Sequence, residues 1–350
     1  MNGELLFLTV LGGIFISLFG IFFGLLFKGI DRKIVARMQM RVGPPIRQPF
    51  LDVVKLMNKE TVLPENAVPW MYHLAPIVCL VSSAILLLYI PIPGLEAIQL
   101  SMHGDVILVL YLFILSALAM VAGGFASASP FATVGAQREM VTMMSYEFPL
   151  AVVIIGIVWK LWNLSTPTTK NTAFFTLSFL SSKPILSHTY LLGFIGALIL
   201  LFALIVVIPG EVAKIPFDVA EAETEIAHGL LVEYSGRNLA LFYLADGVRM
   251  FAMASLVVAL FFPYNISKYI ALGNFAVVAD FLFFLFKVFL VMLFSITLVR
   301  AGMARLRITQ VVSVYWITIT LIALIGLVLL IWDGDPKLDI LNIPLPWTEV

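Results

Sequence analysis

Residues 209–237 read PGEVAKIPFDVAEAETEIAHGLLVEYSGR and separate two strongly apolar runs, Tyr190–Ile208 and Leu239–Phe262. A carboxylate that faces hydrocarbon is very costly, so this acidic stretch needs water, cations or basic partners. Apolar residues alternate with the acids at helical spacing, which favours a packed segment over the alternative of a solvated acidic loop. The acidic residues of the stretch are Glu211, Asp218, Glu221, Glu223, Glu225 and Glu233.

The same stretch predicts a helix over residues Asp218–Tyr234. Asp218 is typical of a helix start, and Gly236 is typical of the residue that follows a helix end. In such a helix Glu221 and Glu225 lie four residues apart on one face. Closely spaced carboxylates away from water cannot all ionise. These residues are therefore candidates for a row of groups that shares protons.

Composition places the chain in a membrane. Of its 350 residues, 61% are hydrophobic and 12% are charged, whereas a soluble domain carries about 25% charged residues. The formal net charge is zero, which excludes electrostatic binding of nucleic acid. The chain has one cysteine, Cys79, and four scattered histidines. We therefore expect no metal and no cofactor held by this chain.

Eight apolar runs are candidates to cross about 30 Å of hydrocarbon, which predicts an all-α membrane fold with eight transmembrane helices, residues 1–350 forming one transmembrane domain. The fourth run is short, and we expect its helix to start earlier, around Val141. The runs are Leu5–Phe27, Met71–Ile90, Val106–Phe125, Phe148–Trp162, Tyr190–Ile208, Leu239–Phe262, Phe281–Val299 and Val311–Trp332. The odd-numbered loops carry fourteen Lys and Arg residues, against five on the opposite side. We therefore expect the odd-numbered loops, including residues 28–69 and 209–238, in the cytoplasm and both termini outside.

The basic loop of residues 28–69 contains a turn, VGPP, between a basic run and an amphipathic pattern. In IRQPFLDVVKLMNKE, the apolar Phe50, Val53 and Val54 fall on one helical face, and Lys55 falls on the other. This pattern predicts a short amphipathic helix on the cytoplasmic surface, which either docks a partner or binds lipid headgroups. The expected docking residues of this loop are Arg37, Arg41, Gly43, Pro44, Pro45, Arg47, Asp52 and Lys55.

The third loop contains GAQREMVTMMSYEFPL, in which Arg138 and Glu139 precede Glu147. Glu147 falls at the mouth of the fourth predicted span. A carboxylate at that depth is paired, protonated or hydrated, or it lies at the level of the lipid headgroups.

Two pairs of ionisable residues fall within predicted spans. Asp246 and Arg249 are three residues apart, which predicts an ion pair with either a functional or a purely structural role. Asp280 and Lys287 are two turns apart on one face of the next span. Ionisable groups in spans are functional candidates because they are costly to keep there.

Three stretches, taken together, resemble one family. They are RMQMRVGPP with DVVKLMNKE, then Arg138 with SYE at residues 145–147, and PFDVAEAE followed by EYSG. The family is the membrane subunit at the junction between the peripheral arm and the ion-pumping arm of respiratory complex I, where it is called the first or the H-type subunit. Energy-converting membrane-bound nickel–iron hydrogenases share it. The resemblance covers nearly the whole chain, including the eight predicted spans.

Within this family, the chain resembles the archaeal hydrogenase and sulfane sulfur reductase members more than the complex I members. Its GAQREMVTMM segment is similar to theirs, and the insert after VGPP is shorter than the one that shapes the quinone chamber in complex I. The resemblance implies a ferredoxin-driven complex in a prokaryotic cell membrane. The implied partners are an iron–sulfur small subunit with [4Fe–4S] clusters, a large catalytic subunit with a nickel–iron centre in the hydrogenase type, and antiporter-like subunits in the lipid bilayer.

The resemblance also implies a coupling subunit without redox chemistry of its own. Carboxylates would carry a charge or conformational signal from the docked arm into the membrane. The implied relay residues are Glu147, Glu211, Asp218, Glu221, Glu223, Glu225, Glu233, Asp246, Arg249, Asp280 and Lys287, while Arg138 and Glu139 join the docking surface. Two alternatives remain open, a quinone-chamber subunit of complex I type and a stand-alone secondary transporter. The transporter alternative lacks the internal repeat that inverted halves would show.

Overall fold

The computed structural model describes residues 3–95, 99–100, 105–163, 175–187, 189–268 and 273–333. Within these ranges the chain forms helices and turns and no strand. The described residues include eight helical spans long and apolar enough to cross a membrane, which confirms the predicted number. The helices that make up these spans are α1 (Gly3–Met38), α3 (Pro69–Tyr89), α4 (Asp105–Ala126), α5 (Pro130–Asn163), α7 (Leu191–Glu211), α9 (Gly236–Phe261), α10 (Ala276–Met292), α11 (Leu298–Gly302), α12 (Ile308–Ser313) and α13 (Thr320–Trp332).

Short elements connect the spans. They are α2 (Gln48–Met57), α6 (Leu177–Ser182), α8 (Glu223–Ile226), and the 3-10 turns Ile185–Ser187, Val219–Glu221, Gly229–Leu231, Ile266–Lys268 and Gly273–Phe275. Two π-helical turns, Leu293–Thr297 and Val314–Ile319, join α10 to α11 and α12 to α13. The segment between α7 and α9, residues 212–235, is called the acidic connector below.

α9 is the centre of one half of the bundle. It packs against α1, α3 and α10, and nearly every residue from Leu244 to Phe261 is buried. The α1 and α9 backbones touch, because a Cβ added at Gly24 would lie 2.5 Å from the carbonyl oxygen of Gly247. Small residues permit such close approach of membrane helices. This contact brings the next turn of α1 against the polar part of α9.

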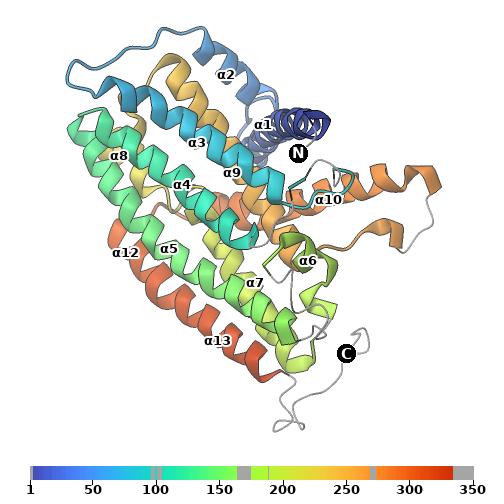
Figure 1. Ribbon diagram of the computed structural model, residues 1–350. Coiled ribbons are helices and arrows are strands. Elements are labelled where there is room, and N and C mark those ends of the chain that lie inside the picture. Colours follow the sequence, from blue (N-terminus) through green and yellow to red (C-terminus); the bar gives the residue numbers. More distant parts are fainter. Residues whose placement is uncertain are drawn as a thin grey trace.

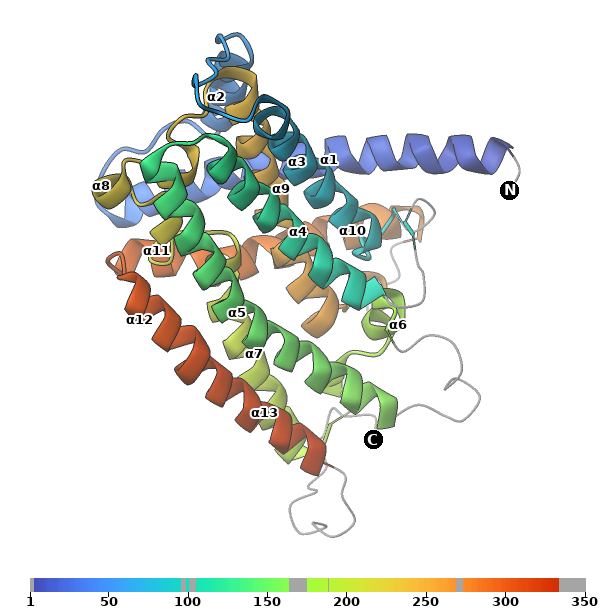
Figure 2. The same cartoon turned by 60° about the vertical axis from the view of Figure 1, so that its left-hand side comes forward.

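The other half of the bundle consists of α5, α7 and α13, which pack against one another, and α4 joins the two halves by packing on α3 and α5. Figures 1 and 2 show α3, α4, α5 and α13 running side by side. In Figure 2, α1 and α10 cross these helices steeply. The acidic connector lies at the end of the bundle where α7 ends and α9 begins.

Two helices are longer than the sequence predicted. α1 continues past the expected end at Phe27, and α5 begins at Pro130, well before the expected start around Val141. The additional turns carry Lys28 and Glu139, which are buried in the protein. Apolar runs therefore underestimate helix length wherever the ionisable residues of a helix face other helices and not lipid.

The helix expected over residues Asp218–Tyr234 is wrong. α8 has only four residues and is followed by Ala227 and His228, with φ of 49° and 73°. An α-helix of L-residues cannot continue through two successive left-handed residues. Glu221 and Glu225 therefore lie on separate turns and do not share a helical face.

Candidate functional site

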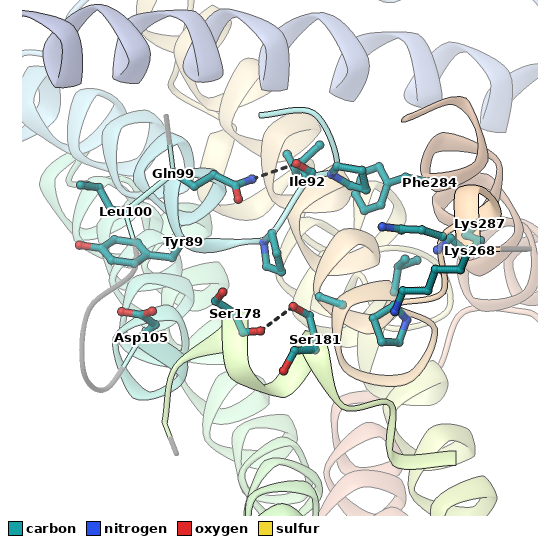
Figure 3. Close-up of a pocket in the computed structure, with 17 residues that line it drawn as sticks. Tyr89, Ile92, Gln99, Leu100, Asp105, Ser178, Ser181, Lys268, Phe284 and Lys287 are labelled. Atoms are coloured by element: carbon teal, nitrogen blue, oxygen red, sulfur yellow. Dashed lines mark hydrogen bonds between the residues drawn. The ribbon is translucent and has the colours of Figure 1, made fainter. Parts of the chain in front are cut away.

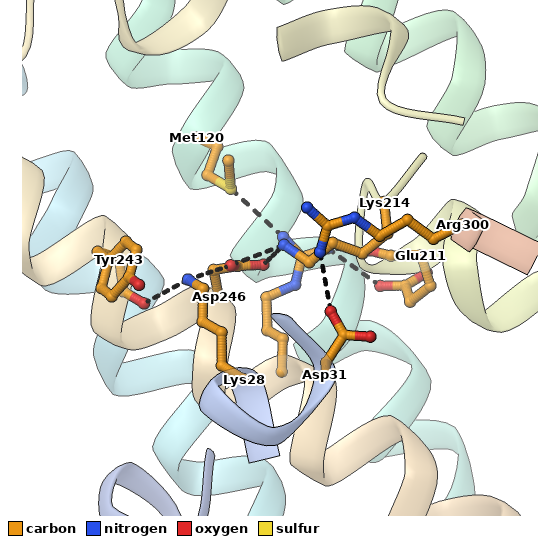
Figure 4. A network of polar contacts seen from close by, with 9 residues as sticks. Lys28, Asp31, Met120, Glu211, Lys214, Tyr243, Asp246 and Arg300 are labelled. Carbon is orange, nitrogen blue, oxygen red and sulfur yellow. Dashed lines mark hydrogen bonds and ion pairs between the residues drawn. The ribbon is translucent and has the colours of Figure 1, made fainter. Parts of the chain in front are cut away.

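Asp246 of α9 is the centre of the first of two ion-pair groups beside the acidic connector. It accepts hydrogen bonds from Lys28 Nζ at 2.6 Å and from Lys214 Nζ at 2.7 and 2.8 Å. Lys28 comes from α1 and Lys214 from the connector, so one carboxylate ties three elements together (Figure 4). The Lys28 ammonium also lies 3.3 Å from the centroid of the Tyr243 ring, which adds a cation–π contact.

Arg249, one turn further along α9, forms the second group. Its guanidinium donates to the backbone oxygen of Glu211 and, at 3.3 Å, to Glu211 Oε1. It also lies 3.3 Å from the sulfur of Met120. Arg249 and Glu211 are each 2% exposed. A single charge at that depth would cost several kcal/mol, roughly 3–5, so each group depends on the other.

The predicted ion pair between Asp246 and Arg249 is wrong. Their spacing permits a pair on an isolated helix, but packing supplies other partners for both. Lysines from α1 and from the connector neutralise Asp246, and the carboxylate at the end of α7 neutralises Arg249. The five residues Lys28, Glu211, Lys214, Asp246 and Arg249 are called the polar network below.

Acidic groups of α5 next to this network lack hydrogen-bond partners. Within the described ranges, Glu139 Oε1, Glu147 Oε1 and the Tyr146 hydroxyl are buried atoms with no partner. Glu139 is 3% exposed, and the charges of Arg249 and Glu221 both act on it. Buried polar atoms are nearly always hydrogen-bonded, and those that are not often have a functional role. α5 therefore places two carboxyl groups beside the network, each with one oxygen that no described protein group contacts by a hydrogen bond.

Glu221 lies between the connector surface and the polar network. Its side chain is half-buried, and its carboxylate has no hydrogen bond or ion pair with the residues that the structure describes. Burial raises the pKa of Glu221 above its usual value, while the nearby Lys214 opposes that shift and Asp246 adds to it. Glu221 thus keeps its proton to a higher pH than an exposed glutamate does.

Two other acids of the connector pair with arginines, and a third is exposed. Asp218 accepts two hydrogen bonds from the Arg305 guanidinium, at 2.6 and 2.9 Å. Glu225, whose side chain is 43% exposed, accepts a hydrogen bond of 2.6 Å from Arg138. Glu223 is exposed. The predicted row of connector carboxylates is therefore divided. Asp218 and Glu225 pair with arginines, Glu223 is exposed, and Glu221 has no ion pair with the residues that the structure describes.

Three predicted relay residues lie apart from the polar network. Glu233 is half-buried near the start of α9. Lys287 donates to two backbone carbonyls just beyond the end of α9, on the side of the bundle opposite the connector. Asp280 accepts hydrogen bonds from the amide and the hydroxyl of Ser267, at 2.9 and 2.6 Å. The structure does not bring these three together with Asp246 and Arg249.

The predicted docking residues fall into two groups. Arg37, Arg41, Pro45, Arg47 and Lys55 are exposed, and Gly43, Pro44, Asp52 and Arg138 are half-buried. A helix, α2, is present where the amphipathic pattern predicted one. Asp52 of α2 forms an ion pair with Arg32 of α1, with 3.1 Å between the guanidinium nitrogen and the carboxylate oxygen. Glu139 is buried, so its predicted place on a docking surface is wrong, and its carboxyl belongs to the interior of the site.

Several ion-pair partners were not predicted. Asp31, 4% exposed, accepts hydrogen bonds of 2.8 Å from Arg300 and from the hydroxyl of Thr297. The sequence identifies three of these partners only as charges of the loops: Lys28, Lys214 and Arg300. Each of the three lies within a turn or two of the end of a predicted span. That position indicates that the residue has an ion-pair partner, because an unpaired ionisable group there is costly. In the described part of the chain, no group of three or more His, Cys, Asp or Glu residues could hold a metal ion.

Comparison with known proteins identifies the family of the chain. The NADH dehydrogenase family matches residues 11–331. The H-type subunit of NADH-quinone oxidoreductase from Syntrophotalea carbinolica (strain DSM 2380 / NBRC 103641 / GraBd1) is 30% identical over 324 residues, covering 87% of this chain and 90% of that protein. Hydrogenase-4 component C of Escherichia coli (strain K12) is 32% identical over 299 residues, covering 85% of this chain and 89% of that protein.

A solved structure shares the fold as well. A chain of the membrane-bound sulfane sulfur reductase, an archaeal respiratory membrane complex, superposes with a TM-score of 0.77 at 26% identity. The match covers 92% of this chain and 99% of that one. With its eight spans and its acidic connector, this chain belongs to the NADH dehydrogenase family, as a membrane subunit of the H type that complex I shares with hydrogenase-4.

Proposed function

We propose that this chain docks the peripheral redox arm of a ferredoxin-driven complex and relays its reaction to the translocation of protons or sodium ions. The relatives are subunits of a complex I-like oxidoreductase and of a hydrogenase, so a membrane subunit of such a complex is the established starting point. One observation carries the proposal. The buried Glu139 and the half-buried Glu147 each have a buried carboxyl oxygen without a described partner, and they lie beside the ion pairs of the polar network at the connector end.

α5 supplies the link between the surface and the interior. Arg138 donates to Glu225 at 2.6 Å and to the carbonyl of Val219 at 3.4 Å, and the next residue is the buried Glu139. A partner whose charge changes during its redox reaction would draw Arg138 toward or away from Glu225. The turn that carries Glu221 would then shift, and the field at Glu139 would change with it. Such a change shifts the pKa of a buried carboxyl, so that the group gains or loses a proton.

We propose the partners that the family resemblance implies. An iron–sulfur small subunit with [4Fe–4S] clusters and a large catalytic subunit, with a nickel–iron centre in the hydrogenase type, would dock on loop 28–69 and on the connector. Antiporter-like subunits would continue the ion path in the membrane. The exposed arginines near α2 support this arrangement, because basic clusters attract acidic surfaces and speed their association. The redox chemistry would take place in the partners.

A quinone-chamber role is the second candidate, because several relatives are NADH-quinone oxidoreductase subunits. Against it, α2 begins at Gln48, directly after the VGPP turn, so little chain is left there to form the wall of a chamber. The purified complex would discriminate between the two functions, since only the second predicts that turnover requires a quinone. No feature of the site favours a stand-alone transporter.

The test of the coupling function uses the complete complex in sealed vesicles. Glu139→Gln keeps the shape of the side chain and removes its proton-binding site, so ions translocated per electron pair should fall while the redox reaction continues. Glu223→Gln, an equivalent change at an exposed connector position, should leave the ratio unchanged. An unchanged ratio in Glu139→Gln would remove this carboxyl from the proposed relay.

A further inference from the structure

The end of α1 carries an exposed apolar tip, residues 38–42. Met40 is 96% exposed and Val42 is 100% exposed, and no other large apolar side chain of the described residues exceeds 74%. α1 ends beside α11, at the end of the bundle where the acidic connector lies (Figure 2). Single apolar side chains at a surface are common, whereas a group of neighbouring ones is typical of an interaction site.

Met40 adopts an unfavourable backbone conformation. Its φ of 58° lies in the left-handed region, at the position just past a helix end where glycine is most common. The hydrogen bonds are those of a Schellman motif, because the Arg41 amide donates to the Ala36 carbonyl at 2.9 Å and the Met40 amide donates to the Arg37 carbonyl at 3.1 Å. A side chain strains this backbone, and one so exposed gives no packing in return. Strain without a gain in the folded chain indicates that the Met40 side chain has a function in binding.

The turn that follows the tip holds it in place. A Cβ added at Gly43 would lie 2.8 Å from the Cβ of Ala36, so the VGPP turn lies directly on α1. A Cβ added at Gly29 would collide with the carbonyl oxygen of Ile46, so the chain after the turn packs on α1 as well. A tip fixed in this way loses little conformational freedom when a partner binds it.

A cavity of about 310 Å³ adjoins the tip, and its charged lining side chains are Arg32, Arg41 and Arg300. Arg32 pairs with Asp52 at 3.1 Å, and Arg300 pairs with Asp31 at 2.8 Å (Figure 4). The Arg41 guanidinium has no hydrogen bond or ion pair with the residues that the structure describes. Two acids thus balance two of the three charges, and one positive charge remains. A guanidinium has five N–H donors, so each arginine can bind a further acceptor.

The charge of this cavity differs from that of the cavity at the opposite end of the bundle. The latter, of about 340 Å³, is lined by two lysines and by the acidic Asp105 (Figure 3). The cavity beside the tip has no acid among its described lining residues, and residues 32–51 include five basic residues and no acidic one. It therefore fits a negatively charged group, and a carboxylate forms strong charge-assisted hydrogen bonds with a guanidinium.

We propose that the tip and the adjoining cavity together bind the peripheral arm. Met40 and Val42 enter an apolar depression of the arm, and an aspartate or glutamate next to that depression enters the cavity and binds Arg41. This inference rests on the docking function proposed above and names the contact that carries it.

The composition of the tip favours a protein partner over lipid. Met and Arg are enriched at protein interfaces. Trp and Tyr are typical of the membrane interface, and residues 32–51 contain neither. The five basic residues of the same range match an acidic protein surface, because complementary charge steers association.

Met40→Gly separates binding from folding. The affinity of the purified subunit for the peripheral arm, released from the purified complex, is measured by biolayer interferometry. Met40→Gly should weaken binding about tenfold, because it removes an apolar side chain from the contact. The same variant should raise the folding equilibrium constant of the subunit about fivefold, because glycine relieves the strain at this φ. A residue with a purely structural role would not combine a gain in stability with a loss of binding.

Three further variants serve as controls. Ala128→Gly is the matched change, since Ala128 is exposed and has a φ of 54° between α4 and α5. It should gain stability and keep the affinity for the arm. Met40→Asn should weaken binding as Met40→Gly does, because Asn tolerates a left-handed backbone but is polar. Arg41→Gln should weaken binding about threefold, as expected for one partly exposed ion pair, and should make it less sensitive to salt.

Methionine footprinting with hydrogen peroxide distinguishes the arm from lipid. In nanodiscs of phosphatidylglycerol and phosphatidylcholine, mass spectrometry should find Met40 oxidised in the subunit alone and protected when the arm is bound. Met253, which is 0% exposed, should stay unoxidised in both. Protection of Met40 in nanodiscs without the arm would assign the tip to lipid and overturn the proposal.

The binding experiment also distinguishes this inference from the docking function on which it rests. Equal affinity of the arm for wild type and Met40→Gly would overturn the inference, while docking through other residues would stand. An arm that does not rebind the wild-type subunit would overturn the docking function itself and this inference with it.

Discussion

Replacing Arg249 by methionine removes a charge and keeps an unbranched side chain at a position where both Arg249 and Glu211 are 2% exposed. The variant leaves the Glu211 carboxylate buried without its cation and removes the hydrogen bond to the Glu211 carbonyl. Breaking a buried ion pair in this way costs about 3–5 kcal/mol, because the remaining charge is uncompensated. We expect Arg249→Met to lower the free energy of unfolding by about that amount, out of a typical total of about 5–15 kcal/mol.

The double variant Arg249→Met with Glu211→Gln should recover most of the loss, because removing both charges of a buried pair is often nearly neutral. The cycle between these two residues should therefore give a coupling energy of at least about 3 kcal/mol, at the upper end of the range for residues in contact. A second cycle, between Asp246→Asn and Arg249→Met, should give less than about 1 kcal/mol. Asp246 bonds to the lysines of α1 and of the connector and not to Arg249.

The assay is reversible unfolding of the purified subunit in mixed detergent micelles, with increasing mole fraction of a denaturing detergent. All variants are measured under the same conditions, and Asp246→Asn alone serves as a control, since it should destabilise by leaving two lysines unpaired. If the coupling energy between Asp246 and Arg249 equals or exceeds that between Glu211 and Arg249, the described arrangement of the polar network is refuted.

Two more predictions concern the basic loop of residues 28–69 and the acidic connector. Charge reversal at three exposed arginines, Arg37, Arg41 and Arg47, should release the peripheral arm at physiological salt while the subunit stays in the membrane, and retention of the arm in pull-down experiments would contradict a docking role. Burial raises the pKa of Glu221 above its ordinary value of 4.5, so the folded state keeps a proton that the unfolded chain has lost, and stability falls as pH rises from about 4.5 through the folded pKa. Glu221→Gln should therefore gain stability relative to wild type across that window, and a pH-independent difference in unfolding free energy would contradict the raised pKa.

The number of spans could be predicted because seven apolar runs are long enough to cross the membrane and the remaining one, residues 148–162, is the apolar part of the longer helix α5. The ends of the spans could not be predicted, because the ionisable residues on their last turns contact other parts of the protein and not lipid. Lys28 and Asp31 continue α1 past its apolar part and find partners on α9 and α11. A hydropathy pattern does not distinguish such turns from a charged loop.

The acidic connector could be located in the sequence, but its conformation and its pairing could not. The positive φ of Ala227 and His228 ends α8 after four residues, although neither residue type marks such a break. The partners of Asp246 could not be predicted from the sequence either, since Lys28 lies 218 positions away in the chain. Spacing within one helix predicts only local pairs. Packing of α1, the connector and α9 decides which charges meet.

Protonation of the buried carboxyls during turnover is measured most directly by redox-difference infrared spectroscopy of the assembled complex with its electron donor. If Glu139 takes up or releases a proton when the peripheral arm is reduced, the wild-type complex gives a difference band in the protonated-carboxyl stretching region. That band should be missing in Glu139→Gln and retained in Glu223→Gln, which alters an exposed carboxylate of the connector. Identical difference spectra in wild type and Glu139→Gln, with normal redox activity in both, would contradict a relay through this carboxyl.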